Sequence, residues 1–107
     1  MQIEKHDYIL ELYDFYSELL TEKQRSYFEG YYFDDLSIGE IAENYGLSRN
    51  AIYDQLKKTC EKLLDFESKL KLNLTYKKIE DILDGELKTK ILDIIKEWNY
   101  GFWFFKW

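Results

Sequence analysis

The chain has 107 residues, of which 46% are hydrophobic and 34% charged, and its formal net charge is −6. This length suits one domain with its own core and is short for a large catalytic fold. The chain has no long apolar run and no N-terminal signal sequence, which predicts a cytoplasmic protein without a membrane span. Its single cysteine, Cys60, excludes an intrachain disulfide. The acidic balance argues against the usual basic nucleic-acid binder.

The first predicted element is an amphipathic helix from about Lys5 to Leu20. Its apolar residues form two adjacent rows at helical spacing, which predicts a broad buried face. The rows are Tyr8, Leu12, Phe15 and Leu19, and Ile9, Tyr13, Tyr16 and Leu20. The outer face is acidic, with Glu4, Asp7, Glu11, Asp14 and Glu18. Such a face is usually only a solvated surface. The alternative is a functional one, in which the acidic face repels nucleic acid.

A second helix begins after Thr21, which can form a capping box with Gln24. Four aromatic residues gather on one side of this helix: Tyr27, Phe28, Tyr31 and Tyr32. A platform for stacking bases would also need basic residues between its aromatics. Here the intervening residues are the acids Glu29, Asp34 and Asp35. The pattern therefore favours core packing, and the two aspartates are expected to lie in the turn that follows.

The stretch from Leu36 to Lys58 has the pattern of a helix-turn-helix. Ala42 is small where two helices would cross, Gly46 follows four residues later where a tight turn needs a positive φ, and Ile52 lies six residues beyond it in the core. This spacing predicts a helix-turn-helix over residues 37–62. A compact corner between two helices, with no nucleic-acid function, is the plainer alternative.

Each of the two helices also has its own start signal. Ser37 and Glu40 can form a capping box for the first helix. Ser48 is placed to cap the second.

The second helix of the motif has two distinct faces. Ile52, Leu56, Cys60 and Leu63 recur at helical spacing and should point inward. A recognition helix offers its outer, N-terminal residues to a major groove. The candidate DNA-binding residues are therefore Ser48, Arg49, Asn50, Tyr53, Lys57 and Lys58. The segment 49–62 carries four basic and two acidic residues. A net charge of +2 attracts phosphates only weakly, so a monomer should bind DNA with low affinity.

The apolar spacing continues beyond this helix and predicts that it runs to about Leu72. Thr75 could then cap another helix that ends at Gly85, followed by a last helix with Leu87 and Ile91 among its apolar residues. The predicted architecture is all-α, with about six helices. We expect one helical domain over residues 1–97 and a separate aromatic tail over residues 98–107.

The tail contains seven aromatic residues in ten. It could pack back on the helices, form a dimer contact, anchor at a membrane interface or dock on a partner protein. Self-association is expected, because two recognition helices on one homodimer could supply the specific DNA affinity that one cannot. The candidate surfaces are the tail and an apolar row on the long helix from Leu56 to Leu74.

A catalytic function is not supported by the inventory of reactive residues. The lone His6 and the lone Cys60 belong to different segments, and the sequence has no glycine-rich phosphate loop and no pair of metal ligands. We therefore expect no enzyme activity and no cofactor.

Three segments of the chain are similar to one known family. They are FYSELLTEKQRSY (15–27), YYFDDLSIGEIA (31–42) and SRNAIYDQLK (48–57). Through them, the region from Leu12 to Leu72 closely resembles the YlxM family of small bacterial helix-turn-helix proteins. The resemblance implies a fold similar to region 4 of bacterial sigma factors. It also implies that Ser48, Arg49, Asn50, Tyr53 and Lys57 hold the recognition positions.

The resemblance also implies a gene neighbourhood shared with the GTPase of the signal recognition particle. A DNA-binding regulatory role in that protein-targeting pathway follows as an expectation. The alternative is a non-enzymatic adaptor that binds a protein or RNA component of the particle.

Overall fold

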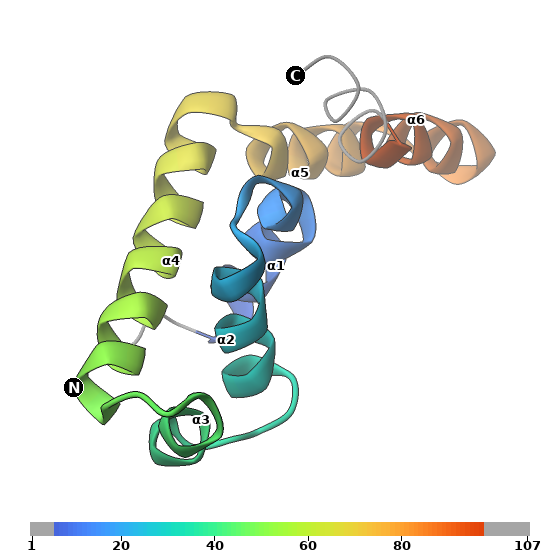
Figure 1. Ribbon diagram of the computed structural model, residues 1–107. Helices are drawn as coiled ribbons and strands as arrows, with labels where there is room; N and C mark the ends of the chain where they lie inside the picture. The colour runs from blue at the N-terminus through green and yellow to red at the C-terminus, as the bar shows by residue number, and fades with distance from the viewer. Residues whose placement is uncertain (1–5, 98–107) are drawn as a thin grey trace.

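The computed structural model describes residues 6–97, and every regular element among them is helical (Figure 1). The elements are α1 (His6–Tyr16), the short 3-10 helix η1 (Ser17–Leu19), α2 (Glu22–Tyr32), α3 (Ile38–Tyr45), α4 (Arg49–Leu70), α5 (Leu72–Ile82) and α6 (Gly85–Glu97). The prediction of an all-α fold with six helices is confirmed. The predicted tail over residues 98–107 and the predicted helix start at Lys5 lie outside the described residues.

Helix α4 is the element on which the others are arranged. It has 22 residues, and α1, α2 and α3 all pack along it (Figure 1). Helix α3 lies at its N-terminal end, whereas α5 and α6 leave from its C-terminal end and project sideways (Figure 1). The radius of gyration is 15.8 Å, compared with roughly 12–13 Å for a compact domain of this length. The excess reflects the projecting arm formed by α5 and α6.

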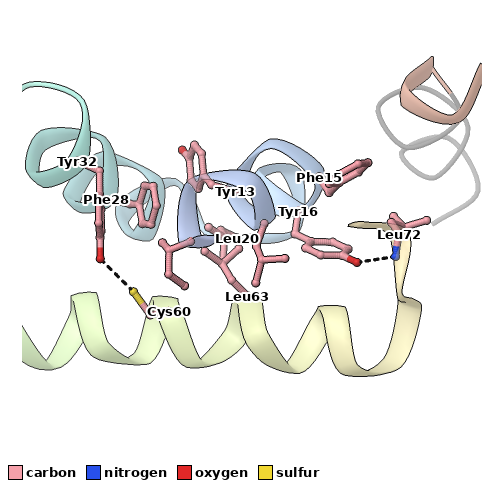
Figure 2. Packing of buried hydrophobic residues seen from close by; sticks show 11 residues of the cluster. Tyr13, Phe15, Tyr16, Leu20, Phe28, Tyr32, Cys60, Leu63 and Leu72 are labelled. Carbon is pink, nitrogen blue, oxygen red and sulfur yellow. Dashed lines mark hydrogen bonds between the residues drawn. The ribbon is translucent and has the colours of Figure 1, made fainter. Parts of the chain in front are cut away.

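The larger core cluster joins α1, α2, α4 and the start of α5 (Figure 2). The ring of Phe28 stacks between Tyr13 at 4.1 Å and Tyr32 at 4.3 Å, measured between ring centroids. The hydroxyl of Tyr32 lies 3.6 Å from the sulfur of Cys60. Tyr13 donates a hydrogen bond to the carboxylate of Glu29, and burial together with this bond raises the pKa of Tyr13. The prediction that the aromatics of α2 and Cys60 belong to the core is confirmed.

The predicted first helix is too long at its C-terminal end. α1 stops at Tyr16, and the next three residues tighten into η1. Leu19 lies in this tighter turn and is 41% exposed. Tyr8, at the start of the same predicted row, is also exposed, at 40%. Arg25 of α2 donates to the carbonyl oxygens of Ser17 and Leu20, at the two ends of this turn, at 3.4 and 3.5 Å. The turn is therefore fixed by a contact from the next helix.

The boundary between α4 and α5 also differs from the prediction. α4 ends at Leu70 and α5 begins at Leu72, with Lys71 between them in a left-handed conformation at φ 55°. Thr75, the predicted cap, lies inside α5. The prediction of one long helix from Leu56 to Leu74 is wrong, because α4 ends at Leu70. Leu56 is fully buried in the chain's own core, so it cannot be part of a dimer surface.

A buried polar network replaces the missing side-chain cap of α5. One carboxylate oxygen of Glu67 accepts from the Tyr16 hydroxyl at 2.6 Å and from the Asn73 amide at 3.1 Å, and the other accepts from the Leu74 amide at 3.0 Å. The Tyr16 oxygen in turn accepts from the Leu72 amide at 3.1 Å (Figure 2). Three amides that would otherwise lack partners at a helix start are thus satisfied. Burial and donation to Glu67 raise the pKa of Tyr16.

Further contacts attach the arm to α1. Lys77 forms an ion pair with Glu11 at 3.0 Å, and the rings of Phe15 and Tyr76 meet edge to face at 5.6 Å. A hollow of about 220 Å³ lies between the arm and α1, and Lys96 of α6 is part of its lining. Gly85, predicted to end a helix, instead has a φ of 65° and begins α6.

Candidate nucleic-acid interface

The turn between α3 and α4 is built around Gly46. Its φ of 66° and ψ of 34° place it in the left-handed region, where a Cβ is unfavourable. The Leu47 amide donates to the Ala42 carbonyl at 2.9 Å, and the Gly46 amide donates to the Glu43 carbonyl at 3.3 Å. This pair of bonds is a Schellman motif, which ends a helix by satisfying its last carbonyls. The predicted glycine turn is confirmed.

The two helices of the motif share a small core of their own. Ala42 is 4% exposed, whereas Ile52 and Leu56 are fully buried, and all three belong to one cluster with Tyr27 and Ile41. The small side chain of Ala42 allows α3 and α4 to approach closely. Because Tyr27 belongs to α2, this cluster also fixes the motif against the rest of the fold.

Both helix starts are capped as the sequence predicts. The Ser37 hydroxyl accepts from the Glu40 amide at 3.0 Å, and the Glu40 carboxylate accepts from the Ser37 amide at 3.1 Å. The Ser48 hydroxyl accepts from the Ala51 amide at 3.0 Å. The start of α4 is therefore a defined, solvent-facing helix N-terminus.

The candidate DNA-binding residues lie between residues 48 and 58, at the cap and in the N-terminal half of α4, and none belongs to a core cluster. Ser48, Arg49 and Asn50 are exposed at the cap and first turn, and Lys57 and Lys58 are exposed two turns later. Tyr53 lies between them and is half-buried. Polar and basic side chains are therefore exposed from the first turn of α4 onward, and their role in binding DNA stays a prediction.

Arg49 does not extend straight into solvent. Its guanidinium group folds back over Gly39 in the first turn of α3, so that a Cβ built on Gly39 would lie 3.0 Å from the Arg49 Nε. The absence of a side chain at Gly39 makes room for this contact. Gly39 was not among the predicted site residues, although a glycine inside a helix is unfavourable and so signals a close approach of another group.

The charges around this face are mixed. Acidic side chains are exposed on α3 and in the turn that precedes it, namely Asp34, Asp35, Glu40 and Glu43. Residues 34–62 contain six acidic and four basic residues. The electrostatic attraction for a phosphate backbone is therefore small, and binding energy has to come from specific contacts.

The helix-turn-helix described above agrees with a comparison against known families. Residues 3–99 match the family described as "Putative helix-turn-helix protein, YlxM / p13 like". The chain belongs to this YlxM/p13-like family. The resemblance drawn from the three sequence segments is confirmed, and it extends beyond Leu72 into α6.

Several bacterial members of the YlxM/p13-like family are similar to the chain over most of its length. A protein of Limosilactobacillus reuteri (strain DSM 20016) is 54% identical over 72 residues, covering 67% of this chain and 64% of the relative. A Geobacillus sp. (strain WCH70) protein is 46% identical over 96 residues, covering 80% of this chain and 86% of the relative. A Bacillus velezensis protein is 45% identical over 94 residues, covering 88% and 81%. The chain thus matches slightly less than two thirds of the length of the L. reuteri protein.

Two further findings limit the kinds of site present between residues 6 and 97. No helix in this range has the length and apolar composition that crossing a bilayer requires. Within the same range, histidine, cysteine and acidic side chains form no group of three that could hold a metal ion.

Proposed function

We propose that this protein is a non-enzymatic DNA-binding regulator that acts in the cytoplasm and contacts DNA with the first half of α4. One observation carries the proposal: the helix that follows the Gly46 turn presents a set of polar and basic residues to solvent from its first turn onward. The set consists of Ser48, Arg49, Asn50, Tyr53, Lys57 and Lys58. In helix-turn-helix proteins this is the region that enters the major groove.

The chemistry of these side chains suggests separate roles. The guanidinium of Arg49 can bond two acceptors on guanine, and the amide of Asn50 can bond adenine in the same way. Lys57 and Lys58 lie farther along the helix and suit phosphate contacts, which position a protein without reading sequence. To reach a base, Arg49 has to leave its contact with Gly39.

We further propose that the regulated process is protein targeting by the signal recognition particle. Membership of the YlxM/p13-like family and the resemblance described above support this role. The runner-up is an adaptor that grips a protein or RNA component of the particle with the same helix. The exposed acids Asp34, Asp35, Glu40 and Glu43 favour the adaptor, because they weaken attraction to a DNA backbone.

A binding titration separates these functions. Fluorescence anisotropy would compare the promoter of the protein's own gene, an unrelated duplex, the particle's RNA and its GTPase, each at two salt concentrations. If the regulator proposal holds, Arg49→Ala lowers affinity for the specific duplex by about 1–3 kcal/mol, whereas Lys57→Ala weakens all duplexes alike and lowers the salt slope by about 1. Lys78→Ala, which removes one positive charge from an exposed position on α5, serves as the control.

Unchanged affinity of the Arg49 variant for DNA would refute the recognition-helix assignment. Binding to the particle's RNA or GTPase without DNA binding, lost on the same substitutions, would establish the adaptor in its place.

A further inference from the structure

Helix α6 has two apolar faces. One packs inward, where Leu92 is 7% exposed and Ile95 contacts the main core cluster. The other faces outward: Leu87 is 59% exposed and Ile94 is 62% exposed, with the half-buried Ile91 between them. The main neighbour of α6 is α5, so nothing in residues 6–97 covers the outward face.

The spacing of the outward residues identifies what could cover them. Leu87, Ile91 and Ile94 are separated by four and then three residues, which is the spacing of a seam between two paired helices. A polar surface helix would place charged residues at these positions. Here the charged residues lie beside the seam instead of on it.

From this spacing and its flanking charges we infer that α6 is a homodimer surface, on which the seam packs antiparallel against α6 of a second copy. In the register set by the seam, Lys90 and Glu97 occupy the same flanking position one heptad apart. An antiparallel pair brings this flank of each helix against the same flank of its partner. Lys90, which pairs with Glu86 of its own helix at 3.3 Å, then also faces Glu97 of the other copy, and the symmetry of the dimer forms this contact two times. A parallel pair would place Lys90 against the flank that contains Ile95 and would lose this match.

The size of the surface sets the strength of the dimer. A standard stable interface buries about 800 Å² on each partner, and one helix with three seam residues offers less. We therefore expect a reversible dimer with a dissociation constant in the micromolar range. The inference does not depend on DNA binding, because α6 and the α3–α4 turn lie at opposite ends of α4 (Figure 1).

Sedimentation velocity on the full-length chain, from about 1 to 200 μM, tests the surface. The wild type should shift from monomer to dimer across this range, whereas the variant Leu87→Lys/Ile94→Lys should stay monomeric. Asp93→Lys is a matched control, because it changes the net charge of the same helix by the same +2 at an exposed position outside the seam. It should dimerise like the wild type. Circular dichroism melts of both variants confirm that the fold is retained.

Charge exchange tests the orientation of the two helices. Lys90→Glu and Glu97→Lys should each weaken the dimer roughly tenfold at low salt, because each places like charges opposite one another at both symmetry-related contacts. The double variant Lys90→Glu/Glu97→Lys should restore dimerisation. A wild type that stays monomeric at 200 μM, or a seam variant that dimerises as well as the wild type, would overturn the proposed surface. A double exchange that fails to restore association would overturn the antiparallel arrangement.

Discussion

Replacing Gly46 isolates the energetic cost of the turn from every other effect. A Cβ added at this residue would meet no atom within 4 Å, so its cost is the backbone strain of a left-handed conformation alone. For Gly46→Ala that strain is about 1–2 kcal/mol. A domain of this size loses about 4–8 °C of melting temperature per kcal/mol. Gly46→Val should cost more than Gly46→Ala, because a β-branched side chain is a stronger outlier at positive φ.

Gly46→Asn supplies the decisive control for this prediction. Asparagine carries a Cβ but tolerates the left-handed region, so its melting temperature should lie between those of the wild type and Gly46→Ala. Glu43→Ala, at an exposed position of α3, should change stability by less than roughly 0.5 kcal/mol. The measurement is thermal or urea unfolding followed by circular dichroism. If Asn at residue 46 destabilises as much as Ala or more, tolerance of a positive φ does not set the cost and the reasoning fails.

Other perturbations address the remaining contacts. Gly39→Ala should leave the melting temperature unchanged or higher, because alanine favours a helix and the flexible Arg49 side chain can move aside; a lower melting temperature would mean that the Arg49 contact is rigid. Glu67→Ala removes the acceptor for one hydroxyl and two amides, so urea unfolding should show a loss of at least about 2 kcal/mol. The raised pKa values of Tyr13 and Tyr16 mean that the folded chain holds these protons more tightly than the unfolded chain. Their contribution to stability is complete below a pH of about 10 and is lost above it, so unfolding free energies from pH 8 to 11 should fall less steeply in a Tyr13→Phe/Tyr16→Phe variant.

The features that the sequence predicted correctly depend on neighbours in the chain. The capping box of Ser37 and Glu40, the cap at Ser48 and the turn at Gly46 each join residues no more than five apart, and the residue types themselves determine the geometry. The inward and outward faces of α4 follow from a single helical period. Local chemistry was therefore enough to place the candidate interface.

The features that the sequence did not predict depend on distant partners. Tyr16 and Glu67 are 51 residues apart, and their bond makes the start of α5 possible at Leu72 without a capping side chain next to it. Thr75 had the right chemistry for a cap but the wrong surroundings. The left-handed conformation of Lys71 could not be predicted either, because the residue type lysine does not distinguish a left-handed backbone from a helical one. The contact of Arg49 with Gly39 likewise joins two helices and has no counterpart in the local pattern.

The unbroken length of α4 has a consequence for how related sequences can vary. The helix spans 22 residues, or about 33 Å, with the candidate DNA-binding residues toward one end and the arm at the other. An insertion of one residue near its middle would rotate one end relative to the other by about 100° and would break the inward row that begins at Ile52. Members of the family should therefore tolerate many substitutions along the outer side of this segment but no change in its length, which an alignment of their sequences can check.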